Sequence, residues 1–265
     1  MTVAASQSGG SGLQIPGLDE LFPPAVFFKG TIIQMTRIDL VRILVAVVLC
    51  VLLLLGARSI KLTQRGRGQQ IFEFIMDFIY HNLVLEQLGP KMGRKYFPFL
   101  AWIFLSIFAL NLTGVIPFLN VSSNSLVAVP MIFAVLAYLA FIIAGIKAHG
   151  AGHYFKEELF PEGAPQPVYV LLTPIEFLST FIVRPFTLTV RLMANMMAGH
   201  FLLLAFATMT EYLLVEAGGW LKPVSVLSFL ACVVFTGLEL FIEALQAYIF
   251  TLLAASYIGL AREGV

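Results

Sequence analysis

Two apolar segments in the second half of the chain are much longer than a bilayer is thick. They cover residues 170–214 and 224–260, which as continuous α-helices rising about 1.5 Å per residue would be about 67 Å and 55 Å long. The hydrocarbon core of a bilayer is about 30 Å thick, so upright helices cannot account for either segment. Each segment must therefore break into two or lie strongly tilted.

The residues that could break these segments are few. The first segment contains Pro185 and Gly199, whereas the second contains only Gly237 and Gly259 and has no internal proline. We therefore expect two long, strongly tilted helices, although the average tilt of a membrane helix is only about 20°. Glycines and a proline at residues 218–223 predict a turn that joins the two helices as an antiparallel hairpin.

The chain as a whole has the composition of a polytopic membrane protein. Of its 265 residues, 59% are hydrophobic and 12% are charged, whereas soluble domains carry about 25% charged residues. Residues 38–57, 97–119 and 126–146 are apolar and close to the roughly 20 residues that one membrane crossing needs. The predicted fold is all-α, with a single membrane domain at residues 38–265 that contains about five membrane helices.

Two other segments are expected outside the hydrocarbon core. Residues 69–88 place Gln70, Glu73 and Asp77 on one face and apolar side chains on much of the rest, which favours an amphipathic helix lying along the membrane interface. Residues 1–37 begin with a stretch rich in glycine and serine that lacks the basic start and short apolar core of a signal peptide. We expect them to form an N-terminal tail outside the cell.

Basic residues predict the orientation of the chain. They cluster after the first span, before the second and after the third, whereas residues 120–125 carry no charge. By the positive-inside rule the charged loops are cytoplasmic, which places the N-terminus outside and the C-terminus in the cytoplasm. The basic residues concerned are Arg58, Lys61, Arg65, Arg67, Lys91, Arg94, Lys95, Lys147 and Lys156.

Arg191 lies in a stretch where almost nothing else is charged. Residues 192–210 contain no Asp, Glu, Lys or Arg, and His200 is their only titratable side chain. An arginine at bilayer depth costs about 2.5–3.5 kcal/mol, and it stays protonated, so it cannot avoid this cost by becoming neutral. We infer that its positive charge serves to meet a negative charge that arrives and leaves.

Other polar side chains share faces with each other on the two long segments. Asn195 follows Arg191 by one helical turn, whereas His200 points to roughly the opposite side of the helix. On the second segment, the spacing i, i+4, i+7 places three polar residues on one face. Ionisable groups inside a membrane by default mark an ion or proton path. The three residues are Glu239, Glu243 and Gln246.

A purely structural role is the alternative for several of these side chains. Thr187 and Asn195 could bridge two helices by hydrogen bonding, and Arg184 could extend its charged end to the cytoplasmic interface. The two glutamates are different, because carboxylates one turn apart repel each other unless one is protonated or a cation is near. Taken together, the set favours a function in ion or proton transfer. Glu176 adds a carboxylate early in the first long segment.

The sequence predicts no metal and no cofactor. His149 and His153 have the spacing of an HExxH zinc motif, but the glutamate is missing. His200 could bind zinc with Glu239 and Glu243 only if the long helices brought them together, and no second histidine lies nearby. A phosphate-binding glycine loop and a GxSxG nucleophile motif are both absent from the sequence. The two cysteines lie inside apolar runs, and we expect them to be buried, inert thiols.

Three motifs resemble those of the a subunits of F-type ATP synthases. The run RPFTLTVRLMANMMAGH at residues 184–200 is similar to the family pattern RP-x-S-L-x-x-RL-x-x-N-x-x-AGH. The run ELFIEALQAYIF at residues 239–250 resembles the closing motif of the family, and NLTGVIP at residues 111–117 matches an NL-x-G-x-x-P element. The resemblance extends from about residue 40 to the C-terminus. Thr187, where serine is usual, is a modest departure that touches no titratable group.

The resemblance implies the stator half of a rotary proton motor. The chain would be a non-catalytic, proton-translocating subunit, and its two long helices would form a hairpin against a rotor ring. Arg191 is similar to the family's essential arginine, which faces the carboxylate of each passing c subunit. Asn195 and Gln246 match the polar positions beside that arginine.

The resemblance also implies a proton path with two half-channels. His200 and Glu239 match a facing pair whose identities are exchanged in some members of the family. Glu239 and Glu243 would belong to the half-channel that opens to the outside. Glu176 would line the half-channel that opens to the cytoplasm.

Partners and location follow from the same resemblance. The expected partners are the c-subunit ring, the b-type peripheral stalk subunits, the remaining F1Fo complex and membrane lipid, but no nucleic acid. The expected location is the bacterial plasma membrane. The alternative function is a self-contained proton-coupled transporter, which should show internal repeats that this sequence lacks.

Overall fold

The computed structural model describes residues 25–27, 35–58, 66–116, 124, 126–159, 166–215 and 222–263. Most of the predicted tail at residues 1–37 lies outside them, as do most of the uncharged loop at residues 120–125 and most of the turn at residues 218–223. The described elements are helices apart from a short antiparallel pair, β1 (Ala25–Phe27) and β2 (Met35–Thr36). Five of the described helical stretches are long and apolar enough to cross a membrane. The prediction of an all-α polytopic membrane protein is confirmed.

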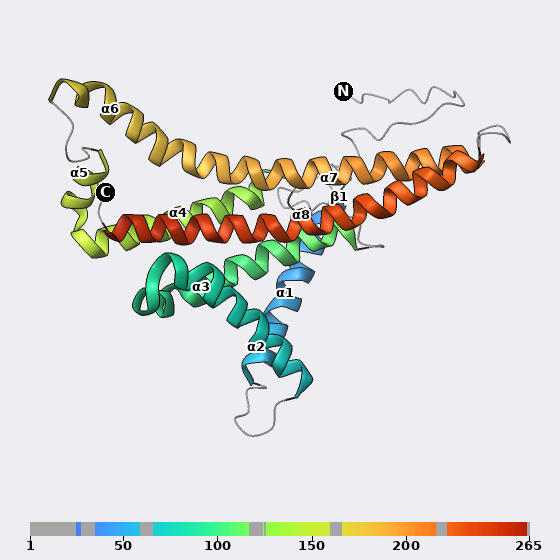
Figure 1. Cartoon of the computed structure of the whole chain (residues 1–265), viewed down its shortest axis with the longest axis horizontal. Helices are drawn as coiled ribbons and strands as arrows, with labels where there is room; N and C mark the ends of the chain where they lie inside the picture. The colour runs from blue at the N-terminus through green and yellow to red at the C-terminus, as the bar shows by residue number, and fades with distance from the viewer. Residues whose placement is uncertain are drawn as a thin grey trace.

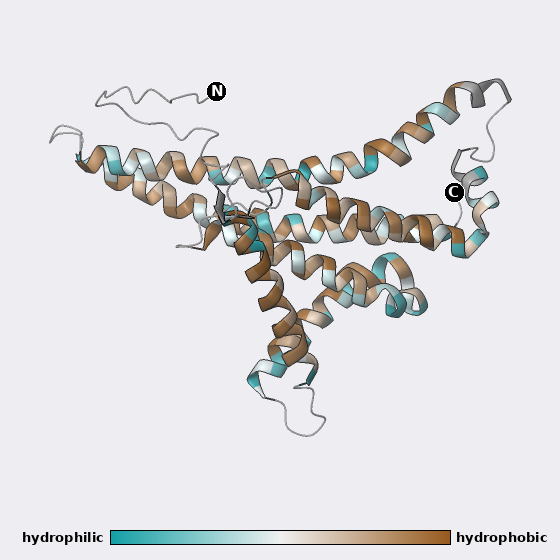
Figure 2. Ribbon diagram, turned by 180° about the vertical axis from the view of Figure 1, so that it is seen from behind, coloured by the Kyte–Doolittle hydropathy of each residue, from teal (hydrophilic) through white to brown (hydrophobic). Residues whose placement is uncertain are grey.

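Helix α1 (Arg37–Arg58) is a single hydrophobic helix on the outside of the bundle. It begins with reciprocal capping: the hydroxyl of Thr36 donates to Asp39 Oδ2 over 2.7 Å, and the Asp39 backbone N–H donates back to that hydroxyl over 3.4 Å. Figure 2 shows that the helix is apolar along nearly its whole length. A helix that is apolar all round and mostly exposed is suited to face lipid.

The next helices form one nearly continuous run from residue 67 to residue 115. Helix α2 (Arg67–Ile79) passes through a π-helical turn, η2 (Tyr80–Leu85), into α3 (Glu86–Val115). The run kinks at Gly89, whose φ of 65° is left-handed, and Pro90 follows it. The predicted interfacial helix covers residues 69–88, and the non-helical backbone of Gly89 interrupts the helix at that point. The span begins earlier than the predicted residue 97, because the helix resumes with Pro90 directly after Gly89.

Helix α4 (Ala128–His149) ends at a sharp corner. Gly150 has φ 81° and ψ 151°, and α5 (Ala151–Leu159) starts directly after it. The corner folds the ring of Tyr154 back against Gly145 of α4, where a side chain would collide with it. The short α5 is thereby fixed against the end of α4.

The first long segment is helical from residue 166 to residue 215. It consists of α6 (Gln166–Leu178), a π-helical turn, η3 (Ser179–Val183), and α7 (Arg184–Val215). The π-helical turn lies immediately before Pro185, because a proline has no N–H and its ring crowds the carbonyl four residues earlier. Figure 1 shows the run bending between α6 and α7. Gly199, the second possible break, lies within regular helix.

The second long segment is a single helix, α8 (Lys222–Glu263), of 42 residues and therefore about 63 Å long. It lies beside α7 as the other arm of a hairpin and also packs against α3 and α4 (Figure 1). Near the turn, the Thr210 hydroxyl of α7 donates to the Ser228 hydroxyl of α8 over 2.9 Å. Neither long segment breaks into two upright spans.

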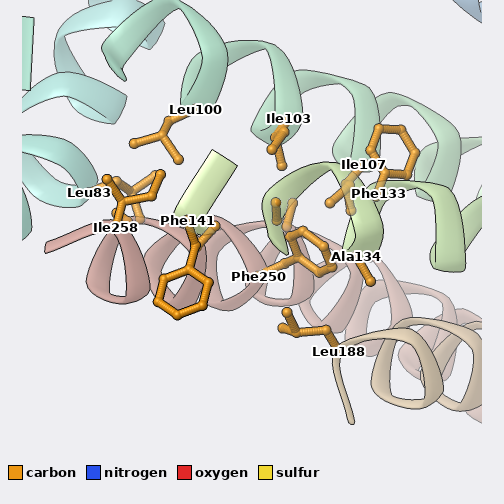
Figure 3. Close-up of a cluster of buried hydrophobic side chains, with 14 of the residues drawn as sticks. Leu83, Leu100, Ile103, Ile107, Phe133, Ala134, Phe141, Leu188, Phe250 and Ile258 are labelled. Carbon is orange, nitrogen blue, oxygen red and sulfur yellow. The ribbon is translucent and has the colours of Figure 1, made fainter. Parts of the chain in front are cut away.

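The hydrophobic core lies where α3, α4 and α8 meet. Figure 3 shows Leu100, Ile103 and Ile107 of α3 facing side chains of α4 and α8. Leu188 from α7 completes this cluster from the other side of α8. The core therefore anchors α8 along much of its length and leaves the outer faces of the hairpin uncovered.

Replacing Gly150 is predicted to destabilise the corner between α4 and α5. Its φ and ψ lie in a region that is essentially restricted to glycine, so Gly150→Ala should cost about 1–3 kcal/mol. Gly152→Ala is the matched control, because a Cβ at position 152 meets no atom within 4 Å. The melting temperature of the purified protein should fall for the first variant and not for the second. Equal melting temperatures would mean that the corner is not strained.

Candidate functional site

Five polar side chains line one cavity between α3, α7 and α8. The cavity has a volume of about 280 Å³, and its remaining walls are apolar. Helix α8 supplies three of the five from a single face, as the spacing i, i+4, i+7 predicts. The five residues are Asn111 from α3, Asn195 from α7, and Glu239, Glu243 and Gln246 from α8.

Both glutamates of the cavity are buried without hydrogen-bond partners. Glu239 and Glu243 are each 5% exposed, and none of their carboxylate oxygens accepts a hydrogen bond within the described part of the chain. A carboxylate in such surroundings is costly unless it takes up a proton or is hydrated. The cavity is large enough for several water molecules. The pair is therefore suited to accept and release protons.

Glycines on the facing helices make room for these carboxyl groups. A Cβ at position 199 of α7 would lie 2.6 Å from Oε1 of Glu239. A Cβ at position 114 of α3 would lie 3.3 Å from Oε1 of Glu243. Glu239 is thus directed toward α7 and Glu243 toward α3, and α8 approaches both helices closely.

An amide pair connects the cavity to the outer face of α7. The Nδ2 of Asn195 donates to Oε1 of Gln246 over 2.8 Å. Gln246 is 3% exposed, whereas Asn195 is exposed. The pair ties α7 to α8 and presents one polar end to the cavity and the other to the outside of the hairpin.

Arg191 lies on the outer face of α7, one turn before Asn195. Its side chain is exposed, and it makes no ion pair with any of the residues that the structure describes. Leu188 and Leu192, on the adjoining face of the helix, are buried. The guanidinium is therefore available to a partner outside the described part of this chain.

His200 and Glu176 are not among the residues that line the cavity. His200 is buried, next to Gly199, against which the Glu239 carboxyl group rests. Glu176 is half-buried on α6, about 22 Å before Arg191 along the helical run. The structure thus brings Asn195 and the three α8 residues together and leaves Glu176 apart.

The structure shows the contacts of two residues near Arg191 that could have a purely structural role. The guanidinium of Arg184 lies over the rings of Phe141 and Tyr257, at 5.8 Å and 5.3 Å from their centroids, and its extension to the interface stays a prediction. Thr187 does not bridge two helices, since its hydroxyl donates to the Val183 carbonyl of its own helix over 2.8 Å. Both side chains stabilise the start of α7.

The cysteines and histidines outside the site form no metal centre. Among the described residues, no group of three His, Cys, Asp or Glu side chains could hold a metal ion. Cys50 is exposed on α1, so the prediction that it is buried was wrong, and Cys232 is half-buried. His149 instead contacts the Arg262 carbonyl at the end of α8, at 3.0 Å from Nε2.

Asn111 is the site residue that sequence reasoning missed. It is 2% exposed, and its Nδ2 lies 3.4 Å from the backbone carbonyl of Glu243. An asparagine in the middle of an apolar span, within the NLTGVIP motif, was the available signal. Nothing in the sequence indicates that this residue meets Glu243.

The chain is similar to ATP synthase A chains. That family matches residues 40–259 of this sequence. The ATP synthase subunit a of Rhodococcus erythropolis is 40% identical over 98% of this chain and 94% of its own length. Those of Frankia alni and a Nocardioides species are 42% and 36% identical, over 86% and 98% of this chain and 77% and 98% of their own lengths.

Replacing Gly199 is predicted to disturb the packing of α7 on the Glu239 carboxyl group. In Gly199→Ala the new methyl group would lie too close to Oε1, so the helices must separate or the carboxyl group must move, at a cost of about 1–3 kcal/mol. Gly237→Ala is the matched control, since it lies two residues from Glu239 and its Cβ meets nothing within 4 Å. Thermal unfolding should show a lower melting temperature for Gly199→Ala alone. A loss of stability in both variants would contradict this account.

Proposed function

The chain belongs to the ATP synthase A chain family, and we propose that it supplies the two proton half-channels of the membrane sector and the arginine that faces the rotor carboxylate. Membership of this family makes it a multi-pass membrane protein that acts in proton transport within a complex of other subunits. The proposal concerns how its residues divide that task. The main observation behind the proposal is Arg191, whose permanent charge lies on the outer face of the hairpin and is not neutralised by any described residue.

Arg191 acts on the carboxyl group of each passing rotor subunit. An opposite charge at close range favours the ionised form of a carboxyl group, so the rotor site releases its proton as it reaches the arginine. The released site can move away only after it takes up another proton, because a neutral carboxyl group is far less costly in lipid than a carboxylate. Rotation is thereby coupled to proton transfer.

The cavity behind Arg191 serves as the half-channel that opens to the outside. Protons pass along Glu243 and Glu239 and reach the rotor by way of His200. The supporting observations are the burial of both carboxyl groups, their lack of hydrogen-bond partners among the described residues and the space around them. A group that transfers protons must not be locked into a permanent hydrogen bond, and these two are not.

Separation of the two half-channels prevents a leak. Glu176 lines the cytoplasmic half-channel, and its position on α6 places it well away from the cavity. Arg191 lies between them along the helical run, and its fixed positive charge opposes a proton that hops directly across. Each proton that completes the route through the rotor releases about 2.3 kcal/mol per 100 mV of membrane potential.

The remaining parts of the proposal concern orientation and partners. The N-terminus lies outside and the C-terminus in the cytoplasm, as the basic loops indicate. The outer faces of α7 and α8 contact a ring of c subunits, and b-type peripheral stalk subunits hold the chain still. The uncovered apolar surface of the hairpin supports a contact with a hydrophobic partner.

Arg191→Ala is predicted to abolish ATP-driven proton pumping while the complex still assembles. The exposed guanidinium has no partner in the described part of the chain, so its removal should leave the fold intact. Pumping is measured by quenching of a pH-sensitive dye in inverted membrane vesicles. Arg94→Ala, which removes an exposed arginine at the start of α3, is the control and should pump normally. Normal pumping by Arg191→Ala would sink the proposal.

Glu239→Gln is predicted to slow passive proton conduction through the membrane sector by at least about tenfold, since a positioned proton-transfer group contributes about 10²–10⁴ in rate. The amide keeps the shape of the side chain but cannot take up a proton. The measurement is the proton flux, driven by a membrane potential, into vesicles from which the catalytic sector has been removed. Glu86→Gln, an exposed glutamate at the start of α3, should leave the flux unchanged. Unchanged flux in Glu239→Gln over a wide pH range would remove Glu239 from the path.

A further inference from the structure

A pair of buried amides leads from the cavity toward the connection between α3 and α4. The Nδ2 of Asn124 donates to Oδ1 of Asn111 over 2.7 Å. Asn124 is fully buried, and Asn111 is 2% exposed. Asn111 in turn lines the cavity and lies 3.4 Å, by its Nδ2, from the backbone carbonyl of Glu243. The two amides thus form a polar chain that ends at a proton-path residue.

Asn124 determines which way the Asn111 amide points. The two ends of an amide are nearly equal in shape, so only hydrogen bonds decide between its two orientations. The donor from Asn124 requires an oxygen at the near end of Asn111, which turns the amino group toward α8. Without Asn124, only the long 3.4 Å contact with the Glu243 carbonyl would hold the Asn111 amino group toward α8.

The position of the Glu243 carboxyl group makes this orientation relevant. It rests against Gly114 of α3, one helical turn from Asn111. At the other end of the cavity, the ring of Phe235 lines the wall and stacks on Phe206 at 4.7 Å. Beyond Glu243, polar groups continue on two sides within the part of the chain that the structure describes: toward α7 through Gln246 and Asn195, and toward α3 through Asn111 and Asn124.

The side-chain oxygen of Asn124 is the polar atom at the far end of this amide pair. Its Oδ1 is buried and accepts no hydrogen bond from any described residue. A buried acceptor of this kind is normally satisfied by an ordered water molecule. Asn124 therefore has one end on Asn111 and the other end available to water.

We propose that Asn124 is a positioning residue for proton transfer at Glu243, because it orients the Asn111 amide and holds water on the side of the cavity that faces the α3–α4 connection. This inference rests on the proposed function, since it assigns a supporting role within the proposed outer half-channel. Asn124 itself exchanges no proton. Its effect passes through Asn111.

The test measures passive proton conduction by membrane vesicles that contain the complete membrane sector, from which the catalytic sector has been removed. Asn124→Ala should lower conduction about fivefold, as expected for the loss of one buried hydrogen bond. Asn111→Ala should lower it at least as much. The double variant should conduct like Asn111→Ala alone, because Asn124 acts only through Asn111. Multiplied effects, or unchanged conduction in Asn124→Ala, would overturn the proposal.

Controls separate this role from a structural one. Ser256→Ala removes a partly buried hydrogen bond of 2.9 Å between α8 and Gln87, away from the cavity, and should conduct normally. If Asn124→Ala does not assemble, Asn124→Leu keeps the volume of the side chain without its polar groups. Failure of both to assemble would show that Asn124 serves the fold and would refute the inference.

A further variant distinguishes failure of this inference from failure of the proposed function. Glu243→Gln should stop conduction if Glu243 carries protons. If Glu243→Gln blocks conduction and Asn124→Ala does not change it, only the role of Asn124 is wrong. If Glu243→Gln conducts normally, the proposed outer half-channel fails as well, and the role of Asn124 fails with it.

Discussion

The close approach of α8 to two glycines is the constraint on which the rest of the structure depends. Gly199 of α7 and Gly114 of α3 leave space in which the carboxyl groups of Glu239 and Glu243 are buried. A larger residue at either position would force the helices apart or displace the carboxyl group. Because α8 is anchored along its length by the core with α3 and α4, it cannot simply move away. The glycines therefore decide that the polar groups lie inside the bundle, and the cavity follows from this.

In the hairpin, Arg191 and the two buried glutamates lie on opposite sides of α7. Arg191 is exposed on the outer face of α7, whereas the glutamates are buried behind that helix on α8. An arginine paired permanently with a carboxylate of its own chain would have no charge left for a partner. The Asn195–Gln246 hydrogen bond is a neutral link across the same interface, so it fixes the two helices without neutralising Arg191. This separation is the physical basis of the proposed function.

Helical periodicity allowed part of the site to be predicted. The spacing of Glu239, Glu243 and Gln246 places them on one face in any α-helix, and the structure has them there. Asn111 could not be assigned to the site, because its contact with Glu243 joins residues 132 positions apart in the chain. The ring contacts of Arg184 could not be predicted either, because its two aromatic neighbours come from α4 and from the end of α8, far from it in the sequence. Contacts between residues so far apart in the chain leave no local pattern in the sequence.

The sequence by itself determined the class of protein and the presence of two helices longer than a bilayer is thick. Long apolar runs with few charges indicate membrane helices, and the scarcity of breaking residues in the last segment favours one long helix. Only the tertiary structure decided which faces turn inward, that the helix resumes directly after Gly89, and that Asn124 reaches Asn111. The reason is physical: hydropathy and periodicity act within a helix, whereas the orientation of a helix depends on side chains of other helices that compete for the same space.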